Sequence, residues 1–158
     1  IVGSRSKINL AYIAGFLDGD GSLMLQIKKR KDGNKSRKRF MLTICFYQDT
    51  RHEKPLFWIR KILKIGYISR RNDGISELRI NGYKQIEHIL KDLLPFIKFK
   101  KKQADLLHKS SKILQKSDLG RKEFLKLVSN IIAIQSENYV TRKKKTKKEL
   151  LKILGLTP

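Results

Sequence analysis

The segment from Leu10 to Leu23 has the sequence LAYIAGFLDGDGSL, and its first part is typical of a helix. Ala11, Gly15 and Gly19 recur every four residues, so on a helix they form one ridge that carries no bulky side chain. A ridge of this kind allows a second backbone to approach closely. The segment therefore predicts a helix whose small residues pack against another backbone.

Two acidic residues, Asp18 and Asp20, stand where this helix should end. Gly19 and Gly21 alternate with them and favour termination of the helix. A packing ridge that ends in acids is an unusual combination. An ordinary buried helix followed by a solvated turn has the same spacing, so the spacing by itself leaves both interpretations open.

The composition points to a polyanion as the partner. The chain of 158 residues has 37 Lys and Arg against 14 Asp and Glu, a formal net charge of +23 and a pI near 10.3. Such a field favours nucleic acid or an acidic membrane. Hydrophobic residues make up 40% and occur in periodic runs, which argues against disorder. We expect one domain over residues 1–158, with 1–7 and 141–158 peripheral or flexible.

Cysteine and histidine usage disfavours disulfides and zinc. Cys45 is the one cysteine of the chain, which excludes an internal disulfide and suits a reducing, intracellular compartment. His52, His88 and His108 are far apart in sequence and show no metal-ligand spacing with it, so we expect no zinc. No apolar run reaches membrane-spanning length, and we expect no membrane partner.

Hydrophobic periodicity predicts helices that alternate with β-hairpins. This order is typical of a single α+β (mixed α/β) domain built around an antiparallel sheet. The expected elements are a helix at 5–20, strands at 22–29 and 40–47, a helix at 55–64, strands at 67–71 and 75–80, helices at 83–94, 101–115 and 121–135, and a short helix that ends at Gly155.

Basic residues gather on the two hairpins. Eight of the twelve positions from Lys28 to Arg39 are Lys or Arg, and the second hairpin carries Arg70, Arg71 and Arg79. A two-stranded ribbon fits the major groove of DNA. Lysine on an exposed strand can also serve only to prevent edge pairing, but two basic hairpins in so positive a chain favour nucleic acid. The candidates for contacts with base edges are Gln26, Lys28, Arg30 and Arg39.

Asp20 suggests a metal, because a carboxylate that faces DNA is electrostatically unfavourable unless a cation lies between them. Mg²⁺ binds carboxylate and backbone oxygens and stabilises phosphoryl transition states. One aspartate is a small ligand set for two metals. Two copies of the chain would supply the pair, and the ridge of small residues would permit them to meet.

These residues resemble a known family. IAGFLDGDG at 13–21 resembles the LAGLIDADG motif of homing endonucleases encoded in introns and inteins, and LLPFIKFKKKQA at 93–104 looks like that family's PFL-K-K-K-Q-A segment. The single copy of the motif is similar to the homodimeric subgroup. The resemblance implies an antiparallel sheet shaped as a saddle with helices on one face. It also implies an Mg²⁺-dependent enzyme that makes a double-strand break in a long pseudo-palindromic DNA site.

The resemblance also implies roles for the residues of the first segment. Asp20 matches the acid that binds divalent metal at the dimer axis, and the backbone carbonyl of Gly19 is a further candidate ligand. Asp18 matches an acid tied to helix packing and capping across the interface. Ala11, Gly15, Asp18 and Gly19 would then form the dimer interface.

Further site residues follow from the same resemblance. Gln48 is similar to a polar residue that orders water near the scissile phosphate, and Lys100 matches a lysine of the same solvent network. A third basic residue falls at Arg51 or His52, and Arg51 is taken as the candidate. The implied DNA-binding face consists of Ser22, Met24, Gln26, Lys28, Arg30, Arg37, Arg39, Met41, Thr43, Cys45, Ser69, Arg71, Glu77 and Arg79.

One alternative remains open at this point. The family also includes RNA maturases, which bind the RNA of their own intron without cutting DNA, and their charge pattern would look the same. A basic membrane-surface module fits poorly, because no helix joins a basic face to large exposed apolar residues.

Overall fold

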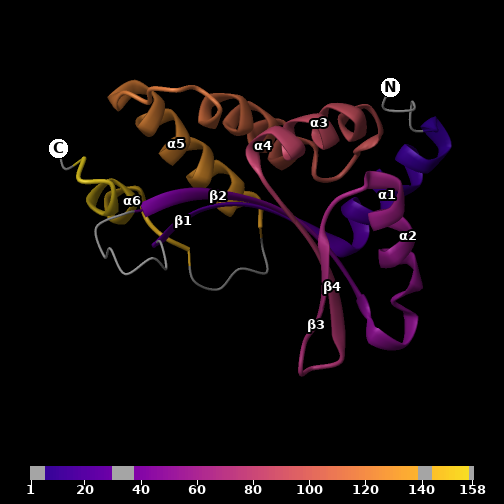
Figure 1. Cartoon of the computed structure of the whole chain (residues 1–158). Helices are drawn as coiled ribbons and strands as arrows, with labels where there is room; N and C mark the ends of the chain where they lie inside the picture. The colour runs from indigo at the N-terminus through magenta and orange to yellow at the C-terminus, as the bar shows by residue number, and fades with distance from the viewer. Residues whose placement is uncertain (1–5, 30–37, 139–143, 157–158) are drawn as a thin grey trace.

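The computed structural model describes residues 6–29, 38–138 and 144–156. Its centre is a four-stranded antiparallel sheet with the strand order β1-β2-β4-β3. The long strands β1 and β2 form the first predicted hairpin, and the short strands β3 and β4 form the second, which projects beyond the helices (Figure 1). The strands are β1 (Gly21–Lys29), β2 (Lys38–Asp49), β3 (Tyr67–Arg70) and β4 (Ile75–Asn81).

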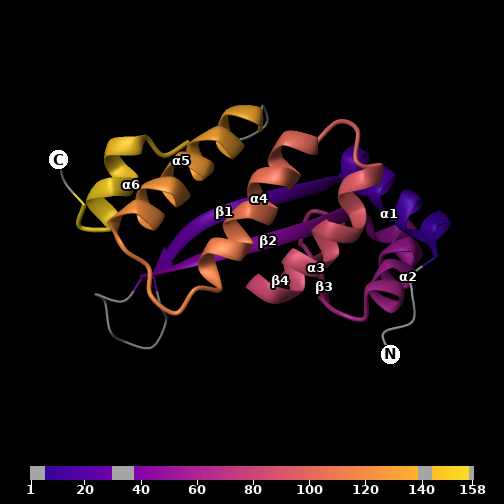
Figure 2. The ribbon, with the colours of Figure 1, turned by 90° about the horizontal axis from the view of Figure 1, so that it is seen from above.

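The helices gather on one side of the long strands. Seen from above, α4 crosses β1 and β2, while α5 and α6 lie toward one end and α1 and α2 toward the other (Figure 2). The α+β fold predicted from the sequence is therefore confirmed. The helices are α1 (Lys7–Asp20), α2 (Lys54–Leu63), α3 (Tyr83–Leu93), α4 (Lys101–Leu114), α5 (Arg121–Glu137) and α6 (Lys147–Ile153), with short 3₁₀ turns η1 (Thr50–His52) and η2 (Leu94–Phe96).

The alternation of side chains along the strands separates a core face from an open face. Leu23, Leu25 and Ile27 of β1 pair with Ile44, Leu42 and Phe40 of β2, and all six are buried beneath the helices. The residues between them in sequence lie on the opposite face of the sheet. No helix in the described part of the chain is long and apolar enough to cross a membrane.

The helix α1 passes directly into the strand β1 without an intervening loop. Gly19 stays inside the helix, and Gly21 follows it in an extended conformation, with φ −129° and ψ 170°. A Cβ atom on Gly21 would lie 2.6 Å from Leu17 Cδ1 and 2.8 Å from the Leu17 carbonyl oxygen. Gly21 is therefore required by close approach to α1, rather than by the helix-ending conformation that the sequence suggested.

We predict that Gly21→Ala lowers the free energy of unfolding by about 1–3 kcal/mol, because the new methyl group would clash with the Leu17 backbone. Urea denaturation followed by circular dichroism measures this change. Gly120→Ala is the matched control, since its nearest neighbour, at 3.1 Å, is the end of the flexible Glu123 side chain. Equal effects of the two substitutions would contradict the steric explanation.

Candidate functional site

Asp20 is the last residue of α1, immediately before the first residue of β1. Its side chain is exposed and accepts no hydrogen bond from the residues that the structure describes. Gly19 beside it is also exposed, and no atom from the described part of the chain lies within 4 Å of the position that a Cβ would occupy. The carboxylate at this junction is therefore open to a ligand from outside the chain.

Asp18 is bonded to a distant segment of the same chain. Its carboxylate accepts backbone N–H bonds from Lys98 (2.7 Å), Phe99 (3.1 Å) and Lys100 (2.9 Å), just before α4. Partial burial raises the pKa of this carboxyl group, but the three N–H donors and the charge of Lys100 outweigh it and lower the pKa overall. The capping predicted across an interface thus occurs within the chain in this structure.

Lys100 completes a reciprocal contact with the end of α1. Its ammonium group donates to the carbonyl oxygens of Leu17 (3.1 Å) and Asp18 (2.6 Å), at the negative end of the helix dipole. Burial lowers the pKa of this ammonium, and the charges of Asp18 and Asp20 offset part of the effect. The structure therefore brings Lys100 to the helix end that carries Asp20.

Gln48 lies at the C-terminal end of β2, and Arg51 lies in the η1 turn that follows. Gly21 pairs with Phe46 in the sheet, which places Gln48 two residues beyond the α1–β1 junction. The Gln48 amide oxygen accepts the backbone N–H of Asp49 at 2.9 Å. The exposed guanidinium of Arg51 is held by the Asp49 carboxylate through two bonds of 3.0 and 2.8 Å. That pair lowers the pKa of the Asp49 carboxyl well below its usual range.

The open face of the sheet carries the described members of the predicted DNA-binding set. The register aligns Ser22 with Cys45 and then Arg79, Gln26 with Met41, Lys28 with Arg39, and Ser69 with Glu77. Residues that are 57 positions apart thus stand in one row across the sheet. Arg30 and Arg37 lie outside the described residues.

Three members of the predicted set are buried on this face, which corrects their expected role. Thr43 and Cys45 have 0% and Glu77 has 7% of their surface exposed. The Thr43 hydroxyl donates to the Asn81 side chain at 2.8 Å, and burial raises the pKa of the Cys45 thiol. Cross-strand neighbours cover these side chains, so they do not stand free to contact a base edge.

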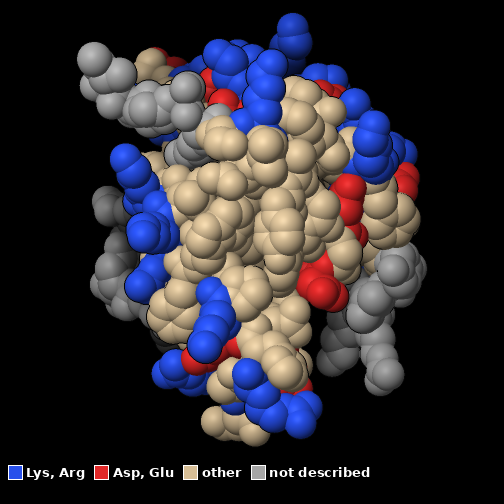
Figure 3. All heavy atoms as spheres, turned by 90° about the vertical axis from the view of Figure 1, so that its right-hand side faces the viewer, with Lys and Arg blue, Asp and Glu red and all other residues tan. Residues whose placement is uncertain are grey.

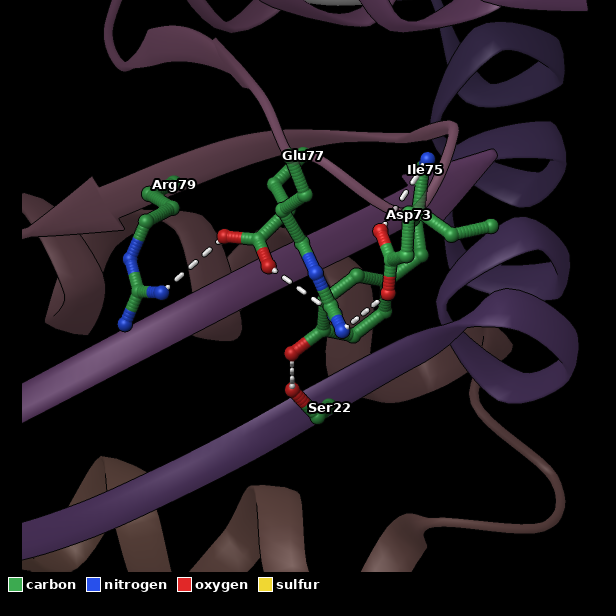
Figure 4. A network of polar contacts seen from close by, with 7 residues as sticks. Ser22, Asp73, Ile75, Glu77 and Arg79 are labelled. Carbon is green, nitrogen blue, oxygen red and sulfur yellow. Dashed lines mark hydrogen bonds and ion pairs between the residues drawn. The ribbon is translucent and has the colours of Figure 1, made fainter. Parts of the chain in front are cut away.

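Glu77 holds two arginines on the open face, and Figure 4 shows its contact with Arg79. Its carboxylate oxygens lie 3.3 Å from Nη1 of Arg71 and 3.0 Å from Nη1 of Arg79. Nη2 of Arg71 also lies 2.6 Å from the Asp73 carboxylate. The side chains of Arg71 and Arg79 are 48% and 28% exposed, so both retain N–H donors that face solvent. A buried acid between two arginines fixes the direction in which they point.

Tyr47 belongs to this face but was not among the predicted residues. Its hydroxyl lies 2.9 Å from the Ser22 hydroxyl, and burial raises its pKa to about 12. The alternation that placed Thr43 and Cys45 on this face extends to Tyr47 and was sufficient to find it.

The predicted ridge of small residues is not covered by any residue that the structure describes. Ala11, Gly15 and Gly19 are exposed, and a Cβ on either glycine would have no atom of the described residues within 4 Å. The large side chains of Ile8 and Tyr12 on the same helix are 82% and 53% exposed. Figure 3 faces this end of the molecule and shows a broad uncharged area with Lys and Arg at its margin.

The described residues contain no group of three His, Cys, Asp or Glu side chains that could hold a metal within one chain. Asp20 and the Gly19 carbonyl are hard oxygen donors, which suit a cation such as Mg²⁺ rather than zinc. They make up only part of a coordination shell.

The sequence of this chain matches a known protein family over most of its length. Residues 13–110 match the family model described as LAGLIDADG endonuclease. The chain belongs to the LAGLIDADG endonuclease family. It is 36% identical over 104 residues to DNA endonuclease I-CvuI of Chlorella vulgaris, a match that covers 65% of this chain and 63% of that relative, less than two thirds of its length. It is 30% identical over 149 residues to DNA endonuclease I-CreI of Chlamydomonas reinhardtii, covering 94% and 90%.

Solved structures of LAGLIDADG proteins share the fold. A crystal structure of the homing endonuclease I-CvuI in complex with the I-CreI target matches with a TM-score of 0.82 and 25% identity over 94% of both chains. The archaeal intron-encoded homing endonuclease I-Vdi141I, complexed with DNA, matches with a TM-score of 0.78 and 19% identity, covering 94% and 95%. The second match shows the fold alone.

We predict that Asp18→Asn lowers the free energy of unfolding at pH 7 by about 1–2 kcal/mol, because charge-assisted bonds to three N–H groups are lost. The native pKa of Asp18 lies below 3.8, so its stabilisation is present at neutral pH and disappears as the pH falls through that native pKa. Urea denaturation at several pH values should show the two proteins converging only at the acid end. Asp118→Asn, at an exposed position between α4 and α5, is the control. Equal stability of Asp18→Asn and wild type at pH 7 would contradict the capping role.

Proposed function

We propose that this LAGLIDADG protein is a site-specific homing endonuclease that makes a metal-dependent double-strand break in DNA as a homodimer. The observation that carries the proposal is the exposed Asp20 at the end of α1, next to a ridge that none of the described residues covers. Both named relatives are DNA endonucleases, and one was crystallised on DNA in the presence of Mg, with the DNA not cleaved. No observation favours the alternative of an RNA maturase.

The dimer would form by contact of two α1 helices along Ala11, Gly15 and Gly19. In a two-fold dimer the same patch meets itself, so each residue of the ridge lies near its own copy. Because Asp20 is one residue beyond the last glycine of the ridge, the two Asp20 carboxylates would come together at the axis. The pair would supply the second carboxylate ligand that a single chain lacks.

Mg²⁺ is the cofactor that this donor set fits. Two Asp20 carboxylates and two Gly19 carbonyls would offer hard oxygen ligands to divalent cations, which supply activation of water and neutralisation of charge on the phosphate. Lys100 would place a positive charge beside the same phosphate, since the carbonyls of Leu17 and Asp18 fix its position. Gln48 and Arg51 would order water and phosphate oxygens at the end of β2.

The open face of the sheet would bind the DNA. The nine residues of β1 span roughly 30 Å, which corresponds to about nine base pairs. A two-fold dimer would therefore recognise a pseudo-palindrome of roughly twenty base pairs. The side chains that are exposed or half-buried on this face, and so suited to base or phosphate contacts, are Ser22, Met24, Gln26, Lys28, Arg39, Met41, Ser69, Arg71 and Arg79.

We predict that Asp20→Asn reduces cleavage by more than about 100-fold, since loss of a metal ligand should exceed the roughly 10–100-fold cost of losing an outer-shell partner. Binding should persist, because removal of a negative charge does not weaken contact with DNA. The test selects a target from randomised duplex DNA with Mg²⁺, then measures cleavage by gel and binding in Ca²⁺. Asp105→Asn on α4 serves as the control. Full cleavage by Asp20→Asn would refute the metal assignment.

We predict that Gly15→Leu separates the dimer, because the bulky side chain would stand on the ridge and hold the two helices apart. Sedimentation equilibrium should give the mass of a monomer for the variant and of a dimer for the wild type. Ser129→Leu, at an exposed position of α5, places the same side chain away from the ridge and should leave the dimer intact. A dimeric Gly15→Leu would show that the ridge is not the interface.

A further inference from the structure

The turn η1, which carries Arg51 and His52, is bonded to the second hairpin. The backbone N–H of Thr50 donates to the Gly74 carbonyl at 2.8 Å, and the Thr50 hydroxyl lies 2.9 Å from the hydroxyl of Ser76. Ser76 is fully buried in β4, so this bond satisfies a hydroxyl that has no access to water. The position of η1 is thus set by the β3–β4 hairpin.

Glu53 adds a second connection at the other end of η1. It stands at the N-cap position of α2, yet its side chain makes no cap bond to the helix. The carboxylate instead bonds Arg70, with Nε at 3.1 Å from both oxygens and Nη2 at 2.5 Å, and accepts the Ser76 hydroxyl at 2.5 Å. The Glu53 side chain is only 15% exposed.

The two sides of the hairpin carry different groups. Arg70 and Ser76 are cross-strand partners, and both bind Glu53 on one side of the hairpin. The neighbouring pair, Ser69 and Glu77, lies on the open face, where Glu77 orients Arg71 and Arg79. The same short ribbon therefore holds the candidate base-reading arginines on one side and the basic turn on the other.

We propose that Glu53 is a positioning residue. It couples the position of the β3–β4 hairpin on DNA to the position of the basic turn η1. This inference rests on the proposed endonuclease function. When Arg71 and Arg79 engage the target, the hairpin takes a defined place in the groove. The Glu53–Ser76–Thr50 bonds then fix η1, and with it Arg51, relative to the scissile phosphate.

Stability alone does not account for this network. The guanidinium of Arg70 is 61% exposed, and ion pairs with an exposed partner contribute little to folding. If Glu53 is removed, Ser76 keeps Thr50 as a partner, so no buried hydroxyl is left without a hydrogen bond. Loss of Glu53 should therefore loosen η1 without unfolding the protein.

The test measures single-turnover cleavage and equilibrium binding on the selected target. Glu53→Ala should slow cleavage by roughly 10- to 100-fold while Kd stays within about threefold, since misplacement of a catalytic group by about 1 Å costs that much. Glu53→Gln keeps an oxygen that accepts from Ser76 and should recover part of the rate. Asp105→Ala, which removes the Asp105–Lys109 ion pair on α4, should match the wild type.

A second comparison tests the transmission itself. A base-pair change that weakens the contact of Arg79 should slow wild-type cleavage more than it weakens binding. The hairpin then lies in the wrong position on the DNA, and η1 is displaced with it. In Glu53→Ala the same change should affect cleavage only as much as it affects binding. The inference would be overturned if the base-pair change reduced cleavage beyond its effect on binding by the same factor in the wild type and in Glu53→Ala.

The outcomes separate this inference from the proposed function. A wild-type protein that binds DNA but never cuts it refutes the endonuclease, whereas a wild type that cuts and a Glu53→Ala that cuts equally fast refutes the positioning role. Parallel loss of binding and cleavage would also overturn it. If Glu53→Ala does not fold, Thr50→Val breaks the other bond to Ser76 and should show the same selective loss of cleavage.

Discussion

The reciprocal contact between the end of α1 and the segment before α4 organises this molecule. Asp18 accepts three N–H bonds from residues 98–100, while Lys100 donates to the last carbonyls of the same helix. The contact fixes where α1 ends, and the absence of a side chain on Gly21 lets β1 start at once. Asp20 lies between these two constraints. Its exposed carboxylate is thus placed by rigid structure on both sides.

Several acids in this basic chain hold arginine side chains. Asp49 holds Arg51, Glu53 holds Arg70, and Glu77 holds Arg71 and Arg79. Each pair limits the directions in which a long guanidinium can point, which would matter more for the proposed recognition of DNA than for stability. Asp20 differs from them because it has no such partner in the described part of the chain. The Asp20 carboxylate is exposed, and no basic side chain of the described residues bonds it, so it is available to bind a cation.

Many features of the fold follow from local patterns in the sequence. The alternation in 22–29 and 40–47 predicted both strands of the first hairpin and the face on which each side chain lies, and the register confirms it. β2 is longer than predicted, from Lys38 to Asp49, because pairing with β1 continues before the apolar run and pairing with β4 continues past it. The burial of Thr43 and Cys45 was missed, since it comes from neighbours on other strands that no local pattern contains.

The helix–hairpin order, the basic face of the sheet and the acidic end of the first helix can be predicted from the residues alone, because periodicity and charge act between near neighbours in the chain. The partners of these groups follow from the way in which distant segments pack. Asp18 meets residues about eighty positions away, Glu53 bonds Arg70 and Ser76, and Glu77 lies between two arginines. Those pairings depend on how the sheet and helices pack, and packing joins segments whose spacing in the sequence carries no signal.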